Sequence, residues 1–578
     1  MTASPLLRVR DLRVGFGRQP AANEVLKGVS FELAAGETLA VVGESGSGKS
    51  VMALSVNRLV DFGGGRITGG SIELFRQDGS TLDVTGATEH DLRHVRGRDI
   101  GMIFQEPMTS LNPVHTIGRQ IEEAFRLNRG ITGAAARAAA REVLERVRIP
   151  DAKTRLDYFP HQLSGGMRQR VMIAMALASS PRLLIADEPT TALDVTVQAQ
   201  IMALLAELRA ETGMAMIFIT HDIGLVAGIA DRILVMQQGL AVEQDEAARV
   251  LDHPQHSYTR HLLEAVPHFA AGRAARTDGR RTDGGTPIVD VRGLVVRFPT
   301  GGSLMRRAGA VHAVDGVDFD LLPGETLAIV GESGSGKSTM ARAILGLVAT
   351  TRGRVVTGAG HSRRPVQMVF QDPFASLNPR LDVEALLAEP AIANGQRRDT
   401  ALRDRMRFLL ERVGLPQDSL SRYPHQFSGG QRQRLCIARA LMLRPDVVVL
   451  DEAVSALDVS VQARVLELLV DLQREFGLAY LFISHDMAVV ERIAHRVAVM
   501  YAGEIVEIGD ATAVLSAPRH SYTRRLIAAV PSVERRQLHY TVDVTQVPSL
   551  VRPAGYEPPG AQWRDVGRDH RVRIEVDA

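Results

Sequence analysis

The sequence GESGSGKS occurs twice in this chain of 578 residues, at residues 43–50 and again at residues 331–338. The match extends upstream to Gly36 and Gly324 with one difference, a valine against an isoleucine. An internal repeat of this kind indicates two copies of one structural unit and has to be recognised before any other fold assignment. The sequence therefore predicts two domains of roughly equal size.

Both copies fit the pattern GxxxxGK followed by Ser or Thr, in which backbone N–H groups close around phosphate oxygens. Lys49 and Lys337 are the predicted phosphate ligands, and Ser50 and Ser338 the predicted magnesium ligands. A compact ammonium fits a tight anion-binding loop better than a guanidinium does, and both loops carry lysine in a chain whose basic residues are nearly all arginine. The predicted nucleotide-binding residues of the loops are Gly43, Glu44, Ser45, Gly46, Ser47, Gly48, Lys49, Ser50, Val51, Gly331, Glu332, Ser333, Gly334, Ser335, Gly336, Lys337, Ser338 and Thr339.

Two acids follow a short apolar run in each half, in LLIADEPTTALD and VVVLDEAVSALD. This pattern is typical of a buried parallel strand that delivers carboxylates at its C-terminal end. We expect Asp187 and Asp451 to orient magnesium, and Glu188 and Glu452 to polarise the attacking water. Two acids after a strand can also be merely solvated, but their place after a phosphate loop favours the catalytic role.

Glutamine and histidine also end apolar runs in both halves. Gln105 and Gln371 lie in GMIFQEP and QMVFQDP, and we expect them to contact magnesium or the attacking water. His221 and His485 lie in FITHD and FISHD. A single histidine at such a place is more often structural. In this order of motifs, contact with the γ-phosphate and with the water or the glutamate is the favoured interpretation.

LSGGMRQR and FSGGQRQR each place a serine and two glycines at the start of a helical stretch. Exposed N–H groups and the positive end of the helix dipole predict a second anion site there. The alternative is a plain serine-capped turn. The residues concerned are Ser164, Gly165, Gly166, Ser428, Gly429 and Gly430.

Phe16 and Phe298 lie upstream of the two phosphate loops. Their position allows stacking on adenine. Core packing is an almost equally good interpretation, so the two alternatives stay open.

Composition excludes several classes of protein. No apolar run approaches the roughly 18 residues that cross a bilayer, and the N-terminus lacks a basic stretch followed by an apolar one, so we expect a cytoplasmic location. The single cysteine, Cys436, excludes an internal disulfide, a cysteine zinc site and an iron–sulfur cluster, and is predicted to be a core residue. A formal charge of +2 gives no reason to expect nucleic acid as a partner.

Motif spacing predicts the domain boundaries. The first domain covers residues 1–267, a flexible Gly- and Arg-containing linker covers 268–286, and the second domain covers 287–531. About 22 extra residues in the first half fall in a strand-and-turn region near 69–98. The polar, proline-containing extension 532–578 is expected to be irregular or weakly ordered.

Phosphate loop, glutamine, LSGGQ-like signature, acid pair and histidine, in that order, resemble the ATP-binding cassette (ABC) ATPases over nearly the whole chain. The resemblance implies an α/β fold: two tandem ABC-type P-loop NTPase domains, each with a mainly parallel sheet core, an antiparallel β subdomain and a helical signature subdomain. It implies ATP and Mg2+ as cofactors. It also implies intramolecular head-to-tail pairing, in which each phosphate loop faces the signature of the other half. Both halves keep their glutamate, histidine and signature serine, so we expect both sites to hydrolyse ATP.

Each half contains an SLNP sequence, and the halves end in HPQHSYTRHLLEAVP and APRHSYTRRLIAAVP. These features are similar to those of the dipeptide, oligopeptide and glutathione importers, in the fused form with both ATPase halves on one chain. This implies the ATP-hydrolysing subunit of a bacterial importer that takes up peptides or related small solutes. Its partners would be two integral-membrane permease subunits, which dock near each glutamine, and indirectly a substrate-binding protein. Its place would be peripheral, on the cytoplasmic face of the inner membrane.

Three departures from the family pattern leave the predicted chemistry in place. Val51 stands where the second half has Thr339, and the second half follows its acid pair with Ala-Val instead of Pro-Thr. The C-terminal region lacks the cysteines that hold an iron–sulfur cluster in many members of this branch.

The chief alternative is a soluble twin-cassette ATPase acting on ribosomes, which would have a long basic helical linker and would leave the SYTR endings unexplained. A DNA-repair cassette ATPase would need zinc-binding cysteines. The identity of the solute is not encoded in these motifs.

Overall fold

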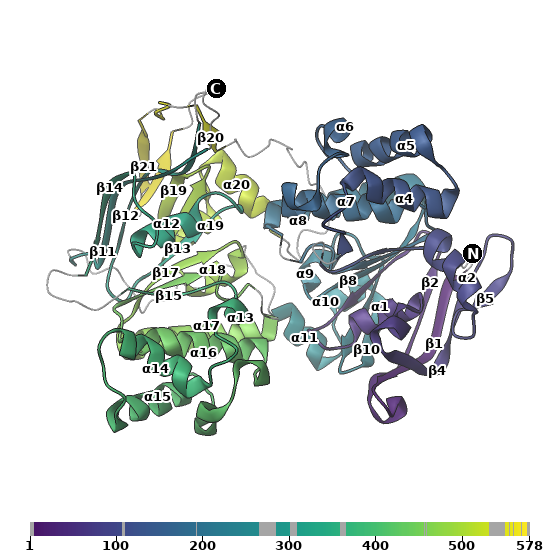
Figure 1. Cartoon of the computed structure of the whole chain (residues 1–578), viewed down its shortest axis with the longest axis horizontal. Helices are drawn as coiled ribbons and strands as arrows, with labels where there is room; N and C mark the ends of the chain where they lie inside the picture. Colours follow the sequence, from purple (N-terminus) through teal and green to yellow (C-terminus); the bar gives the residue numbers. More distant parts are fainter. Residues whose placement is uncertain are drawn as a thin grey trace. The chain divides into compact units, whose positions relative to one another are not determined.

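Two compact units form the described part of the chain, each with an antiparallel sheet, a mainly parallel sheet and a group of helices (Figure 1). The structure is a computed structural model. It describes residues 5–106, 110–191, 193–264, 285–300, 309–358, 366–455, 457, 459–530, 550–553, 555–558, 560–567 and 569–574. The predicted linker 268–286 lies almost entirely outside these residues.

The first unit contains two sheets, in the orders β2-β1-β4-β5 and β10-β9-β3-β8-β7-β6. The second of these is parallel except for β10, and every residue of β3, β7 and β8 is buried. Parallel strands covered on both faces are apolar throughout, as these sequences are. The strands are β1 (Pro5–Phe16), β2 (Glu24–Ala34), β3 (Thr38–Val42), β4 (Gly65–Phe75), β5 (Thr81–Asp83), β6 (Ile100–Ile103), β7 (Leu183–Asp187), β8 (Ala215–Thr220), β9 (Arg232–Gln237) and β10 (Leu240–Glu246).

Helices α4, α5 and α7 form a group of their own beside the parallel sheet (Figure 1). α4 begins at a Thr116 cap and buries Ile117, Ile121 and Phe125 along one face, the spacing expected of an amphipathic helix. The helices of the first unit are α1 (Lys49–Val56), α2 (Glu89–His94), α4 (Ile117–Arg129), α5 (Gly133–Arg146), α6 (Ala152–Arg155), α7 (Gly165–Leu177), α8 (Val195–Thr212), α9 (Ile223–Val226), α10 (Ala247–Asp252) and α11 (Ser257–Glu264).

The second unit repeats this arrangement, with sheets in the orders β14-β11-β12-β20 and β15-β16-β17-β13-β18-β19-β22-β21. Its strands are β11 (Val289–Pro299), β12 (Ala310–Leu321), β13 (Thr326–Val330), β14 (Arg352–Thr357), β15 (Gln367–Val369), β16 (Val447–Asp451), β17 (Ala479–Ser484), β18 (Arg496–Tyr501), β19 (Glu504–Asp510), β20 (Val551–Arg552), β21 (Trp563–Gly567) and β22 (His570–Arg573). Its helices are α12 (Lys337–Ile344), α13 (Pro373–Ser376), α14 (Val383–Ala393), α15 (Thr400–Arg412), α16 (Gly429–Leu441), α17 (Val459–Phe476), α18 (Met487–Ile493), α19 (Ala511–Ser516) and α20 (Ser521–Ala528).

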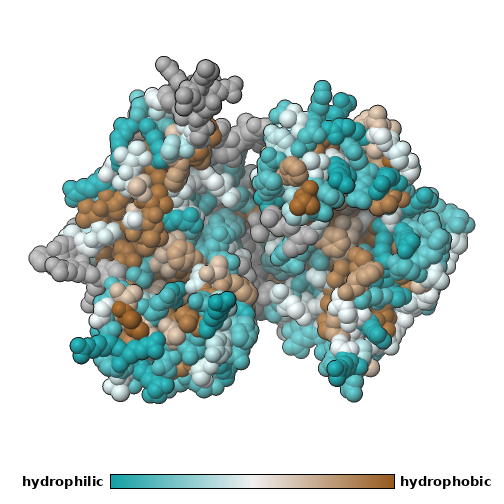
Figure 2. All heavy atoms as spheres, viewed as in Figure 1, coloured by the Kyte–Doolittle hydropathy of each residue, from teal (hydrophilic) through white to brown (hydrophobic). Residues whose placement is uncertain are grey.

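These elements confirm the α/β class and the repeated architecture. Cys436 is buried in α16, as predicted, and its burial raises the pKa of the thiol to about 12. The extra residues of the first half form the end of β4, strand β5 and also the short helix α2, where only strand and turn were expected. Apolar patches lie between polar regions on the visible face of each unit (Figure 2). No helix in the described ranges is both long and apolar enough to cross a bilayer.

The C-terminal extension is the main correction to the sequence analysis. Its described residues were expected to be irregular, but they form β20, β21 and β22 on the second unit. β20 pairs with β12 on the antiparallel sheet, and β22 pairs with β19 on the parallel one. The expectation was wrong because a polar, proline-containing composition does not indicate strands. β20 and β22 form by pairing with strands that lie far away in sequence.

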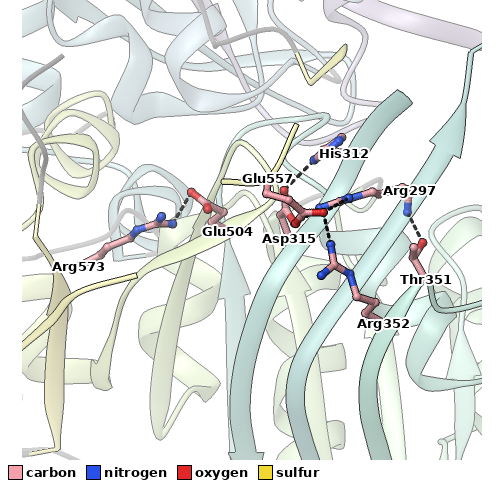
Figure 3. A network of polar contacts seen from close by, with 8 residues as sticks. All are labelled: Arg297, His312, Asp315, Thr351, Arg352, Glu504, Glu557 and Arg573. Carbon is pink, nitrogen blue, oxygen red and sulfur yellow. Dashed lines mark hydrogen bonds and ion pairs between the residues drawn. The ribbon is translucent and has the colours of Figure 1, made fainter. Parts of the chain in front are cut away.

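Charged side chains hold this extension in place (Figure 3). Glu557 accepts hydrogen bonds from Arg297 at 3.1 Å and from Arg352, and these two cations lower the pKa of Glu557 to about 2. Arg297 also reaches Asp315, which bonds to His312 at 2.8 Å. The contact continues at Arg573, which pairs with Glu504.

A buried hydrogen bond adds to this attachment. His570 of β22 lies 2.7 Å from Glu507 of β19, and both side chains are buried. Trp563, the only tryptophan of the chain, packs against the core of the same unit from β21. Its fluorescence therefore reports whether the extension is docked.

We expect His570→Ala to lower the stability of the docked extension by about 1–3 kcal/mol, because the buried Glu507 carboxylate loses a partner. The measurement is urea unfolding followed by Trp563 emission, with a lower midpoint expected in the variant. His261→Ala, at an exposed histidine of α11, is the matched control. An unchanged Trp563 midpoint in His570→Ala would contradict this account of the attachment.

Candidate active sites

The two phosphate loops connect a buried strand to a helix, β3 to α1 and β13 to α12. Gly43 has φ +155° and Gly331 has φ +149°. A Cβ at Gly43 would lie 2.2 Å from the Met236 carbonyl oxygen, and one at Gly331 the same distance from that of Met500. The first residue of each loop therefore has to be glycine, because the loop is pressed against the next strand of the sheet.

Each loop lysine is inside its loop. Lys49 and Lys337 are both 4% exposed. The Lys49 ammonium donates to the carbonyl oxygens of Gly43 at 2.7 Å and Glu44 at 2.8 Å, and Lys337 makes the same two bonds at 2.8 and 2.7 Å. A buried ammonium surrounded by the backbone of a glycine-rich loop is suited to phosphate.

The predicted metal ligands lie together in both units. Ser50 donates to Asp187 at 3.1 Å, and Ser338 donates to Asp451 at 2.9 Å. Burial raises the pKa of Asp187 to about 6, against the hydrogen bond from Ser50, and burial likewise raises the pKa of Asp451. A buried carboxylate held by a serine hydroxyl offers the hard oxygen ligands that Mg2+ prefers.

No group of three or more His, Cys, Asp or Glu side chains within the described residues forms a metal site by itself. This agrees with the usual mode of Mg2+ binding, which takes one or two protein ligands and completes its shell with phosphate oxygens and water. The Ser–Asp pair beside each phosphate loop therefore fits a cation that arrives with a nucleotide.

Glu188 is the centre of a polar cluster in the first unit. Its carboxylate accepts hydrogen bonds from Gln105 at 3.0 Å and from Thr191 at 2.8 Å, and lies 3.3 Å from Nδ1 of His221. Three residues predicted from separate strands thus meet at one carboxylate. Thr191 was not predicted; the only signal for it is its place three residues after the glutamate.

The second unit builds the same cluster from its own residues. Gln371 donates to Glu452 at 2.7 Å, and Nδ1 of His485 lies 3.3 Å from the same carboxylate. Ser455, the counterpart of Thr191, donates instead to the Glu452 backbone carbonyl at 2.9 Å. The two sites are therefore equivalent in their predicted residues and differ in one supporting contact.

Backbone geometry at the glutamates is unusual. Glu188 has φ +45° and Glu452 has φ +49°, in the left-handed region that non-glycine residues rarely adopt. Each backbone N–H is held by the neighbouring strand, at Ile219 and Ile483 respectively. Conformations of this kind persist where the surroundings enforce them and are concentrated at functional sites.

Charge pairing keeps the glutamates ionised in these clusters. Burial acts to raise the pKa of Glu188, but hydrogen bonding to His221 and Thr191 outweighs it and holds the pKa at about 2. Burial acts to lower the pKa of His221, and Glu188 reverses that and raises it. Burial likewise acts to raise the pKa of Glu452, and His485 and Lys337 outweigh it and lower the pKa; burial acts to lower the pKa of His485, and Glu452 raises it.

The signature serines are helix caps. Ser164 precedes α7 and accepts a hydrogen bond from the Met167 N–H at 3.3 Å, and Ser428 precedes α16 and accepts one from the Gln431 N–H at 3.4 Å. The capped turn weighed in the sequence analysis is thus present in both units. Gly165, Gly166, Gly429 and Gly430 form the first turn of each helix, and the anion-binding role of these turns stays a prediction.

Phe16 and Phe298 differ in their surroundings. Phe16 is partly buried against the core of the first unit, whereas Phe298 is 42% exposed at the end of β11. Core packing therefore describes Phe16 better, and Phe298 keeps the open ring face that stacking requires.

Asp187→Asn is expected to raise the free energy of unfolding of the nucleotide-free chain at pH 7.5 by about 1–3 kcal/mol. The folded-state pKa of about 6 lies above the unfolded value of 3.8. Ionisation therefore destabilises the folded chain progressively as the pH rises from about 4 to about 6, and the neutral amide avoids that cost.

The measurement is thermal unfolding across pH, without nucleotide. The gain in Tm should be nearly constant between pH 7.5 and about 6.5 and should shrink as the pH falls from about 6 toward 4, where Asp187 is protonated in the folded chain and increasingly in the unfolded chain. Asp245→Asn, at an exposed position of β10, is the control. A variant that is less stable than the parent at pH 7.5 would show that the buried charge is not destabilising.

Comparison with known proteins identifies the family. The ABC transporter family model matches residues 26–191 and 314–455, and the model for the oligopeptide/dipeptide transporter C-terminal region matches residues 242–287 and 506–557. The chain is 50% identical to the glutathione import ATP-binding protein GsiA of Pectobacterium atrosepticum, over 98% of this chain and 96% of that protein. Identity is 49% to GsiA of Salmonella typhimurium, over 98% of this chain and 96% of that protein, and 48% to GsiA of Escherichia coli K12, over 99% and 97%. The ribosome-acting alternative finds no support in these relatives, and the chain belongs to the ATP-binding proteins of the ABC transporter family, as an ATPase with both cassettes on one polypeptide.

Proposed function

We propose that this ATPase energises a bacterial importer of peptides or related small solutes, with glutathione or glutathione-like compounds as the first candidates. The observation that carries the proposal is the duplicated Gln–Glu–His cluster beside a phosphate loop, in a chain whose relatives are named glutathione import ATP-binding proteins. The proposed location is the cytoplasmic face of the inner membrane, held there by permease subunits.

In the proposed mechanism, the loop N–H groups and Lys49 or Lys337 bind the phosphates of ATP. Ser50 with Asp187, and Ser338 with Asp451, would hold Mg2+, with Gln105 and Gln371 as the further predicted ligands. The cation would neutralise charge that develops on the transferred phosphoryl group.

Glu188 and Glu452 would orient the attacking water and accept its proton. Each glutamate is paired with a histidine, and the lowered pKa makes it a weak base. A γ-phosphate near His221 or His485 would compete for the histidine charge. If the histidine interacted with the phosphate instead of the glutamate, the pKa of the glutamate would rise toward the range of a useful base.

The resemblance to the ABC ATPases further supports head-to-tail pairing of the two cassettes within one chain. In that pairing the Ser428 turn would complete the first site and the Ser164 turn the second. The N–H groups of α16 and α7 would then face the γ-phosphate.

Glu188→Gln and Glu452→Gln should each reduce steady-state ATP hydrolysis strongly, on the order of 10²-fold or more where the two sites work together. Nucleotide binding should be retained, because the phosphate loops are intact. A coupled ATPase assay together with a nucleotide-binding titration makes the measurement. Full turnover in both variants would remove these glutamates from the mechanism.

A groove lies beside the glutamine in each cassette. In the first it has a volume of about 240 Å3 and is lined by residues that include Leu59, Phe104 and Met175. In the second it has a volume of about 430 Å3 and is lined by residues that include Leu347 and Phe370. Both phenylalanines directly precede the predicted catalytic glutamines. We infer that each groove receives a helix of one permease subunit, so that docking and the catalytic glutamine are directly connected.

Leu59→Arg and Leu347→Arg test the two grooves as a matched pair, since these residues occupy equivalent positions after the first helix of each cassette. Each variant should lose copurification of permease subunits from detergent-solubilised membranes, while its basal ATP hydrolysis stays within about twofold of the parent.

Leu240→Arg, at an exposed leucine outside the grooves, is the control and should retain the permeases. Recovery of the parent chain with ribosomes and without multi-span membrane proteins would overturn the importer proposal.

A further inference from the structure

The repeated HSYT sequence contacts the phosphate loop in both cassettes. The Glu44 N–H donates to the Tyr258 hydroxyl at 2.9 Å, and the Glu332 N–H donates to the Tyr522 hydroxyl at 2.9 Å. Each tyrosine lies in the short helix that ends its cassette, α11 or α20, more than 180 residues after the loop it contacts. Neither tyrosine is among the predicted site residues, although both donors, Glu44 and Glu332, are.

The peptide that donates this hydrogen bond is also the one whose carbonyl accepts from the loop lysine. The Glu44 N–H and the Gly43 carbonyl belong to a single peptide unit. Its N–H side is held by Tyr258, and its carbonyl side accepts from the Lys49 ammonium at 2.7 Å. In the second cassette, the peptide between residues 331 and 332 is held in the same way by Tyr522 and Lys337.

Without the hydroxyl, little would fix this peptide plane. It follows a glycine at φ +155° or +149°, and glycine can change its backbone angles at low steric cost. The tyrosines are buried, at 8% and 2% exposure. Loss of the hydroxyl alone would leave a loop N–H facing a ring edge, which favours rotation of the peptide and displacement of its carbonyl from the lysine.

The same network of hydrogen bonds holds the tyrosine in each cassette. The Glu243 carboxylate accepts from the N–H groups of Gln255 and His256, at 2.8 and 3.1 Å, and the His256 ring accepts from the Tyr258 N–H at 3.2 Å. This network fixes the turn from which α11 starts. The tyrosine ring therefore approaches the loop from a defined direction.

The same bonds recur around Glu507 in the second cassette. The Glu507 carboxylate accepts from the backbone N–H groups of Arg519 and His520 at 2.8 and 2.9 Å, and the His520 ring accepts from the Tyr522 N–H at 3.1 Å. Here Glu507 also contacts His570 of the C-terminal extension. The second tyrosine is thus supported by one more element than the first.

We propose that Tyr258 and Tyr522 are positioning residues for ATP binding. Each hydroxyl holds the first peptide of its phosphate loop, and through that peptide it places the loop lysine for the nucleotide phosphates. The proposal rests on the proposed role of the two loops.

The test is Tyr258→Phe, Tyr522→Phe and the double variant in the full chain. Affinity for a fluorescent ATP analogue and the kcat and KM of hydrolysis are measured. Each single variant should weaken one class of sites about 5- to 20-fold, giving a two-phase titration, and the double variant should weaken both. KM should rise more than kcat falls, because the hydroxyl acts on binding and touches neither the water nor the glutamate.

Two controls separate this proposal from a general loss of stability and from the proposed function. Tyr480→Phe removes another buried hydroxyl in the second cassette, one that donates to the Leu469 carbonyl at 2.8 Å. It should leave the affinity unchanged even where it lowers Tm. Lys49→Ala tests the loop itself. Normal affinity in Tyr258→Phe and Tyr522→Phe together with weak binding in Lys49→Ala would overturn the tyrosine proposal and leave the loop assignment standing, whereas normal binding in Lys49→Ala would overturn both.

Discussion

Parallel pairing of neighbouring strands is the constraint on which both candidate active sites depend. β3, β8, β7 and β6 lie side by side in one direction, so their C-terminal ends meet along one edge of the sheet. The phosphate loop, His221, Glu188 and Gln105 each follow one of these ends. Gln105 and His221, more than 110 positions apart in sequence, therefore contact one carboxylate without any long loop to carry them. Repetition of the same strand order in the second cassette reproduces the site at similar distances.

Much of this arrangement could be predicted, because the chemistry and the strands coincide in sequence. An apolar run that ends in Asp-Glu indicates both a buried strand and carboxylates at the end of that strand. The supporting contacts were not predictable in this way. The bond from Glu44 to Tyr258 involves a backbone N–H, which every residue but proline has, so no residue type marks it. The left-handed backbone of Glu188 likewise depends on the neighbouring strand and leaves no trace in composition. The C-terminal strands were missed because their partners, β12 and β19, are remote in sequence.

The two cassettes share the Gln–Glu–His contacts, and they differ in the Thr191 contact and in what surrounds the clusters. Arg297 and His312 bind the C-terminal extension of the second cassette. At the equivalent places in the first cassette stand Gly15 and Glu24, and Glu24 bonds to Thr68 and Arg13 of its own sheet. Equal chemistry is thus combined with unequal support. The outer layer of contacts thus differs between the two candidate sites even where their Gln–Glu–His contacts agree.

The pairing of β19 with β22 has a consequence for the order in which the chain is made. β10, the equivalent of β19, reads LAVEQDE, is only partly covered, and has no further strand beside it among the described residues. A polar edge strand of this kind can remain exposed to water. β19 reads EIVEIGD, and its central residues are buried. An apolar border left open invites pairing with other chains. β22 is the last strand of its sheet to be synthesised, so the nascent second cassette keeps this edge exposed until its final segment is available. In the first cassette, by contrast, β10 is the edge strand of its sheet among the described residues.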